Sequence, residues 1–422
     1  MRAAILVTGD EILRGAIQER NAGILSRSLG PRGVAVDRIE MVGDGLDAIG
    51  GALQRLLAAG FDLICITGGL GPTHDDLTME AVARVTGRRL RLSDEALAMV
   101  QARSLALSRR PDVQAAVQEK QATLPDGARV LPPPGTAPGC ALVHDGTVIV
   151  VLPGPPWELA MMWEEALSHE PVAGLLARAE APHERVLRLW AVPESQLIAE
   201  IDGFDPRAWG RLRVGICARA AELEVTVRAA RGDEWAADAL EERIAERLPE
   251  QLFSRDGRTI DGVVAEGLLA AGQTVAVAES CTGGMLGARL TERPGSSAYV
   301  RGGVIAYAND VKRALLEVPE RILVVDGAVS AECAQAMARG VQRALRADWG
   351  VAITGVAGPG GGTAEKPVGL VYIGVAGPGD SLGHTRHDRG GDRAVIRERA
   401  VAGALHLLRR SLLAGTAVYG HR

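Results

Sequence analysis

The chain has 422 residues and a mass of 44.2 kDa, which exceeds one ordinary core of about 100 to 200 residues and predicts two or three domains. A formal net charge of −5 and an aromatic content of 3% disfavour nucleic-acid binding, which relies on basic surfaces and aromatic stacking. No apolar stretch reaches the roughly 18 to 20 residues of a membrane span, and the start of the chain lacks a secretion signal. We therefore expect a cytoplasmic protein that makes no membrane contact.

Residues 1–170 alternate strand-like and helix-like patterns, as in a parallel sheet covered by helices. The patterns predict strands at residues 3–7, 34–42 and 61–67, and helices at residues 21–29, 46–57 and 78–85. Residues 130–151 predict two strands joined by a turn, followed by a helix that opens at Pro153-Gly154-Pro155-Pro156. This segment is expected to be an α/β domain.

Residues 171–252 predict a small α+β domain with strands at 186–192, 211–218 and 222–229 and helices at 194–201 and 233–248. The order of elements is similar to a KH-type RNA-binding unit, but the segment has no GxxG loop to clamp a nucleic-acid backbone. We therefore interpret it as a spacer or dimerisation domain, and we expect a homodimer.

Residues 258–422 return to an α/β pattern. Helices are predicted at 259–271, 282–291, 310–316, 330–346 and 392–413, and strands at 274–278, 299–307, 350–354 and 369–375. The fold class is therefore α/β, with a parallel-sheet α/β domain, a small α+β domain and a second α/β domain in that order.

Cysteine and histidine spacing predicts neither disulfides nor a zinc site. The five cysteines are scattered and include no CxxC pair. His384 and His387 are spaced as HxxH, but on a strand their side chains would point to opposite faces.

A glycine-rich segment, Gly68-Gly69-Leu70-Gly71-Pro72, follows the third strand of the first domain. Ligands of open α/β sheets bind at such strand ends, where glycines let backbone N–H groups approach phosphate oxygens. Asp75 and Asp76 follow the glycines, and carboxylates there can hold a divalent cation. The alternative is that the glycines serve only the turn and that Asp75, Asp76 and Thr78 cap the next helix. The Walker A and strand-linked GxGxxG patterns are absent, so an ordinary ATPase or dehydrogenase is disfavoured.

Ser280 lies in Ala278-Glu279-Ser280-Cys281-Thr282-Gly283-Gly284, at a predicted strand end that opens a helix. Free N–H groups and the helix dipole there could stabilise an oxyanion, and Lys312, kept neutral by burial, could accept the serine proton. Spacing alone favours a plainer interpretation, in which Ser280 or Thr282 is an N-cap and Lys312 is solvated. Cys281 is a rival nucleophile, because a thiolate at a helix N-terminus is reactive.

Residues 68–80, with 8–13 and 153–158, resemble the molybdopterin-binding (MoCF, MogA-like) domain as it occurs in the CinA family. In relatives that handle molybdopterin, the acid at the position of Asp76 is essential, and a second acid occupies the position of Asp44. In CinA proteins the domain is linked to metal-dependent hydrolysis of ADP-ribose. The resemblance implies a phosphate-binding site formed by Gly68, Gly69, Gly71 and Thr73. It also implies a divalent metal site formed by Asp44, Asp75 and Asp76. Asp76 would also position the attacking water.

Residues 278–284, 302–312, 354–359, 366–369 and 391–397 resemble the carboxy-terminal CinA domain, a nicotinamide mononucleotide deamidase that needs no cofactor. The resemblance implies that Ser280 is the nucleophile and Lys312 its base, with Tyr307 and Ser297 in the proton network. The implied substrate-binding residues are Thr282, Gly283, Gly284, Thr354, Gly355 and Arg393, the last as a phosphate contact.

Two other functions remain open. The first domain could be a molybdopterin adenylyltransferase-like protein, or the chain could be a competence or recombination accessory that acts through protein or DNA contacts. A sequence pI near 6.0 and few aromatic residues disfavour direct DNA binding.

Overall fold

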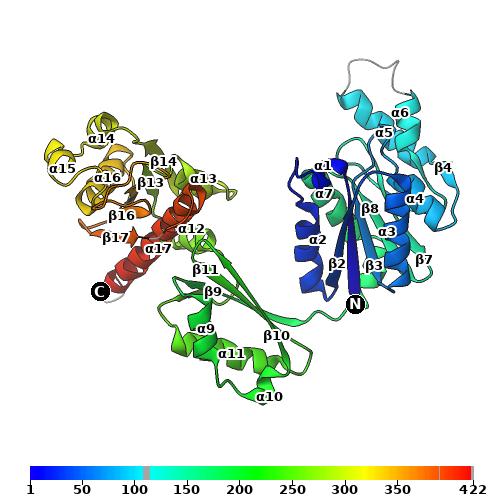
Figure 1. The fold of residues 1–422 in the computed structure, drawn as a ribbon, viewed down its shortest axis with the longest axis horizontal. Coiled ribbons are helices and arrows are strands. Elements are labelled where there is room, and N and C mark those ends of the chain that lie inside the picture. The colour runs from blue at the N-terminus through cyan, green and yellow to red at the C-terminus, as the bar shows by residue number, and fades with distance from the viewer. Residues whose placement is uncertain (108–114, 389, 420–422) are drawn as a thin grey trace. The chain divides into compact units, whose positions relative to one another are not determined.

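The computed structural model describes residues 1–107, 115–388 and 390–419. It forms two compact units, Met1–Pro182 and His183–Arg422. Each unit combines helices with mixed or antiparallel sheets, and the expected α/β class is confirmed (Figure 1).

The first unit contains a six-stranded sheet with the order β2-β1-β3-β8-β7-β6. The first four strands in that order run parallel. Strand β7 runs antiparallel to β8, and β6 runs antiparallel to β7. The strands are β1 (Arg2–Thr8), β2 (Ala35–Val42), β3 (Leu63–Thr67), β6 (Arg129–Leu131), β7 (Gly139–His144) and β8 (Thr147–Leu152). The helices of this unit are α1 (Asp10–Leu13), α2 (Asn21–Leu29), α3 (Leu46–Ala58), α4 (Thr78–Val85), α5 (Asp94–Leu107), α6 (Ala115–Gln121), α7 (Pro156–Leu167) and α8 (Val172–Leu176).

Both faces of the sheet are buried at its central strands β1, β3 and β8, as their short apolar sequences require. Ile5 of β1 packs into a core with α2 and α7, whereas its neighbour Leu6 packs into a second core with α3 and α4, because successive strand side chains point to opposite faces. Figure 1 shows α2 and α7 on one side of the sheet and α3 and α4 on the other. The carboxyl ends of β1, β2 and β3 share one edge, so the loops that follow them converge.

A segment that the sequence patterns did not predict lies between α4 and β6. Strands β4 (Leu90–Leu92) and β5 (Thr123–Pro125) pair antiparallel, and α5 and α6 lie between them in the sequence. The two strands are short, and their pairing spans about thirty residues, so local alternation gives little signal.

The second unit begins with the small α+β domain, which starts at His183 and not at residue 171 as expected, because Val172 and Leu175 pack in the core of the first unit. Its antiparallel sheet has the order β10-β11-β9-β12. Its elements are β9 (His183–Trp190), α9 (Glu194–Ile201), α10 (Pro206–Trp209), β10 (Leu212–Arg219), β11 (Glu222–Ala229), α11 (Glu234–Arg247) and β12 (Leu252–Ser254). The sheet is joined to the last helix, α17 (Arg393–Tyr419), where His406 stacks on Trp190 and its Nε2 lies 2.9 Å from Oε1 of Glu222.

The rest of the second unit has a five-stranded sheet with the order β14-β13-β15-β16-β17. Strands β14, β13 and β15 are parallel. Strand β16 runs antiparallel to β15, and β17 runs antiparallel to β16. The strands are β13 (Val275–Glu279), β14 (Val300–Ile305), β15 (Trp349–Gly355), β16 (Leu370–Ala376) and β17 (Leu382–Asp388), and the helices before α17 are α12 (Ile260–Ala271), α13 (Met285–Thr291), α14 (Asn309–Leu316), α15 (Glu320–Val325) and α16 (Ala331–Ala344). One core contains side chains of α12 and α17, and another contains side chains of α14 and α16.

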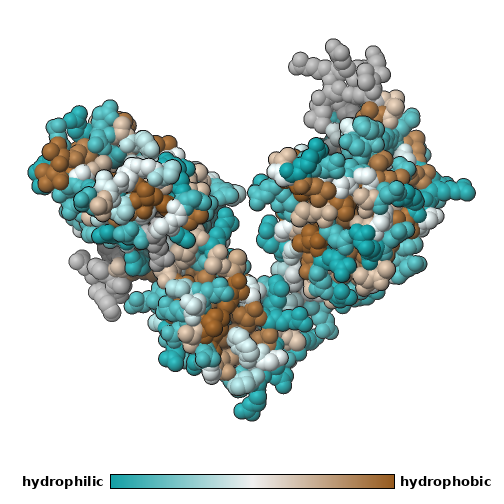
Figure 2. Space-filling model, viewed as in Figure 1, coloured by the Kyte–Doolittle hydropathy of each residue, from teal (hydrophilic) through white to brown (hydrophobic). Residues whose placement is uncertain are grey.

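The face of the molecule drawn in Figure 2 is largely hydrophilic, with separate hydrophobic areas. Val324 and Val325 of α15 are 77% and 70% exposed, and Figure 2 shows hydrophobic surface over this helix at the far left. None of the helices within the described ranges combines the length and the apolar character that a membrane span needs.

Helices α14 and α16 approach closely at Gly340. A Cβ at this position would overlap the main-chain carbonyl oxygen of Leu316. We predict that Gly340→Ala lowers the local stability of α14 and α16 by about 1–3 kcal/mol, as overpacking does. Gly267→Ala in α12 is the matched control, because its Cβ would make ordinary contact with Leu412 and alanine favours helix. Hydrogen exchange should become faster in α14 and α16 for the first variant only, and equal exchange in both variants would contradict this account.

Candidate functional site

Ser280 and Lys312 meet at the carboxyl end of β13. Ser280 directly follows the strand, and its backbone N–H donates to Ile353 O of β15 at 3.0 Å. Lys312 projects from α14, and its Nζ lies 3.3 Å from Ser280 Oγ. Ser280 is 9% exposed and Lys312 is 1% exposed. The structure therefore brings the predicted nucleophile and base into contact, away from bulk water.

The surroundings of Lys312 favour a neutral amine. Burial lowers its pKa, while Cys333 and Cys281 act in the opposite direction, and no carboxylate in the described residues pairs with it. Nζ also lies 2.8 Å from Ala306 O and 3.0 Å from Tyr307 O. A neutral amine has two N–H donors, which these two carbonyls occupy. In that neutral form the lone pair would face the Ser280 hydroxyl, as a general base requires.

Cys281 is a poor rival to Ser280. Its side chain is 6% exposed, and burial raises the pKa of its thiol to about 11. A thiol with that pKa is protonated near neutral pH, and the thiolate is the reactive form.

The helix after Ser280 corrects one expectation. It begins at Met285 and not at Thr282, because Gly283 and Gly284 adopt left-handed conformations with φ of 58° and 98°. The carboxylate of Glu279, 1% exposed, accepts hydrogen bonds from the N–H groups of Gly284, Leu286 and Gly287 at 2.8–3.0 Å. The amides expected to stabilise an oxyanion are therefore already occupied.

Two amides next to Ser280 remain available. Within the described chain, the N–H groups of Cys281 and Thr282 have no hydrogen-bond acceptor. The Thr282 hydroxyl is also buried without a partner, and the Thr282 carbonyl accepts from Arg397 Nη2 at 2.7 Å. Glu279 and Arg397 were both missed as site residues. A charged residue at the end of a buried apolar strand was the signal for Glu279.

The other predicted residues of this domain fall into two groups. Thr354 and Gly355 end β15 beside Ser280, and the Thr354 hydroxyl donates to Ala328 O at 2.6 Å. Arg393 opens α17, and its Nη1 donates to Gly358 O at 2.7 Å. Tyr307 contributes its main-chain carbonyl, while its side chain is 64% exposed.

Ser297 is not brought to this site within the chain. It lies in a turn before β14, and the parallel register pairs the start of β14 with Val275, at the opposite end of β13 from Ser280. At about 3.3 Å per strand residue, this separation is too long for a shared proton network. The expected role of Ser297 is therefore wrong for a single chain.

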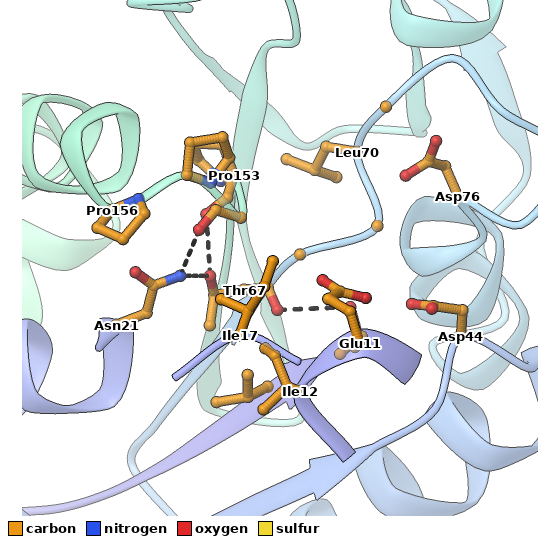
Figure 3. A pocket seen from close by; sticks show the side chains of 18 of the residues that line it. Glu11, Ile12, Ile17, Asn21, Asp44, Thr67, Leu70, Asp76, Pro153 and Pro156 are labelled. Carbon is orange, nitrogen blue, oxygen red and sulfur yellow. Dashed lines mark hydrogen bonds between the residues drawn. The ribbon is translucent and has the colours of Figure 1, made fainter. Parts of the chain in front are cut away.

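A second candidate site lies at the strand ends of the first unit. A cavity of about 480 Å³ is lined by Gly68, Gly69, Gly71 and the side chains around them (Figure 3). Gly68 and Gly69 have φ of 104° and 64°, which favours glycine. In the described part of the chain, the N–H groups of Gly69, Leu70 and Gly71 have no acceptor. Free amides in a row suit an anionic ligand.

The carboxylates of this cavity lie together. Figure 3 shows Glu11, Asp44 and Asp76 on one side of the pocket, opposite Asn21 and Pro156. Oδ2 of Asp76 accepts from the N–H and hydroxyl of Thr73 at 2.8 and 2.5 Å, and Oδ2 of Asp44 accepts from the N–H of Asp10 at 2.9 Å.

Burial raises the pKa of Asp44, and the charges of Glu11, Asp10 and Asp75 add to the rise. Such repulsion is relieved by a nearby cation. No group of three or more His, Cys, Asp or Glu side chains in the described ranges is arranged to hold a metal by itself. The predicted trio of Asp44, Asp75 and Asp76 is therefore not a closed cage. These acids fit a hard cation that takes its other ligands from water and phosphate, as Mg²⁺ does.

In comparisons with known proteins, each of the two candidate sites lies in a region that matches a different family model. Residues 258–412 match the family model "CinA C-terminal domain" and residues 4–172 match "Probable molybdopterin binding domain". CinA-like proteins of Mycolicibacterium gilvum and Mycobacterium sp. (strain JLS) are 43% and 45% identical over 98% of this chain and 99% of theirs. A solved structure, "competence/damage inducible protein CihA" from Agrobacterium tumefaciens, is 41% identical, covers 36% of this chain and 94% of its own, and has a TM-score of 0.35.

The lowered pKa of Lys312 can be measured directly, because the sequence contains three lysines. We predict that one of the three ¹³C-lysine NMR signals titrates below the ordinary value of 10.5 and disappears in Lys312→Met. Between the lowered pKa and 10.5, the unfolded chain holds a proton that the folded chain lacks. The free energy of unfolding should therefore rise with pH in that window, and not in Lys312→Met. Three signals with ordinary titration would contradict the neutral amine.

Proposed function

The chain belongs to the CinA family, and from this premise we propose that its carboxy-terminal domain hydrolyses the carboxamide of nicotinamide mononucleotide to the acid and ammonia. The observation that carries the proposal is the Nζ–Oγ distance of 3.3 Å between Lys312 and Ser280, with both amine protons directed to carbonyls. A serine paired with a buried lysine suits an acyl transfer.

The proposed reaction passes through an acyl-enzyme. Lys312 accepts the Ser280 proton while Oγ attacks the carboxamide carbon, and the free amides of Cys281 and Thr282 are the donors available to the resulting oxyanion. The Lys312 ammonium returns the proton to the leaving nitrogen, the C–N bond breaks and ammonia departs. Water, deprotonated by Lys312, then attacks the ester carbon. The C–Oγ bond breaks, and Ser280 regains its proton.

Arg393 is the proposed contact for the substrate phosphate. One N–H of its guanidinium is held by Gly358 O, which fixes the side chain and leaves other donors for an anion.

For the amino-terminal domain we propose hydrolysis of the pyrophosphate bond of ADP-ribose. The free amides of Gly69, Leu70 and Gly71 suit phosphate oxygens. Asp44, Asp75 and Asp76 are the residues that would hold a divalent cation, whose charge would offset that of the phosphates. Asp76, anchored by Thr73, would orient the attacking water.

Pterin binding is the alternative for this domain, because residues 4–172 match a molybdopterin-binding model. Protein that copurifies with a pterin, or binds one in preference to ADP-ribose, would favour it.

Single substitutions should separate the two activities. Ser280→Ala and Lys312→Ala should each reduce ammonia release from nicotinamide mononucleotide by at least about a thousandfold and leave ADP-ribose cleavage intact. Asp76→Ala should have the reverse effect. Cys281→Ala is the control and should keep most of the ammonia release. Loss of activity in Cys281→Ala with retention in Ser280→Ala would contradict the assignment of the nucleophile.

A further inference from the structure

Lysine is rare in this chain. The sequence contains 44 arginines and three lysines, Lys120, Lys312 and Lys366. In each of the three, the side-chain nitrogen Nζ donates to a main-chain carbonyl outside the strands and helices: Thr73 O, Ala306 O and Asp326 O, respectively. Lys312 already has a proposed role, and Lys120 lies beside the other candidate site.

Lys120 lines a second cavity in the first unit. This cavity has a volume of about 270 Å³ and also contains Gln121 and Met79. It shares Gly69, Leu70, Gly71 and Asp76 with the larger cavity. The glycine segment with the free amides thus borders both spaces.

The two cavities differ in charge. The larger one is lined by six acidic residues and one basic residue, Arg20, whereas the smaller one has Lys120 with Asp76 and Glu80. Lys120 Nζ donates to Thr73 O, next to the hydrogen bonds that anchor Asp76. An ammonium group has three N–H donors, so two remain for a ligand.

We propose that Lys120 binds a phosphate group of a diphosphate-containing nucleotide that lies across the Gly69–Gly71 segment. This inference rests on the proposed pyrophosphate chemistry of the amino-terminal domain. The larger, acidic cavity suits the part of the ligand that would bind a metal ion. In the smaller cavity, the charge of Lys120 would contact a phosphate group directly. Lysine is a common phosphate ligand because its charge is concentrated at one point.

The test is binding of ADP and of adenosine to the full-length chain in magnesium buffer, measured by calorimetry. Lys120→Met should weaken ADP binding at least about tenfold, the loss expected for a charged hydrogen bond, and leave adenosine binding unchanged. Lys120→Gln, which keeps an N–H donor but no charge, should resemble Lys120→Met. Arg129→Met is the control, because Arg129 is exposed in the same unit and lines neither cavity.

Equal ADP affinity in wild type and Lys120→Met would overturn the inference, as would an equal loss in Arg129→Met. Failure of wild type to bind ADP would also overturn it. ADP-ribose cleavage is measured in parallel on the wild type. If cleavage is absent while ADP binding depends on Lys120, the proposed hydrolysis fails and the phosphate contact stands.

Discussion

Burial of one amine organises the carboxy-terminal site. Removing an ammonium group from water is costly unless the group is paired or becomes neutral, and Lys312 has no carboxylate partner among the described residues. Two carbonyls, Ala306 O and Tyr307 O, satisfy its N–H groups. Both belong to the link between β14 and α14, so the backbone that carries the lysine also orients its amine, while burial lowers its pKa.

The position of that amine depends on packing far from Ser280. Helix α14 ends at Leu316, whose carbonyl faces Gly340 of α16 without an intervening side chain. On the strand side, Glu279 fixes the turn after Ser280 by accepting three amide hydrogens. The serine is therefore held by β13 and the Glu279 cap, and the lysine by helix packing.

Much of the fold was predictable because central parallel strands such as β3 and β13 are short apolar runs that are followed by glycine or polar residues. The patterns placed β3, α2 and α9 within a residue or two of their observed bounds. They missed β4 and β5, whose partners are distant in sequence. They also started α13 too early, since the pattern does not report that Gly283 and Gly284 are left-handed. The paired Ser280 and Lys312 came from family resemblance, because spacing alone favoured an N-cap.

The roles proposed for Lys120 and Lys312 each depend on a property that arginine, the far more common basic residue of this chain, does not have. Arginine stays charged in proteins, so it could not act as the neutral base that we propose for Lys312. Lys120 is half-buried beside Asp76, where a small cation can approach the carbonyl of Thr73 and still present donors to the cavity. In these proposals, Lys312 acts because lysine can lose its charge, and Lys120 acts because the charge that it keeps is compact. Replacement by arginine would remove the first property and spread the second over a planar group.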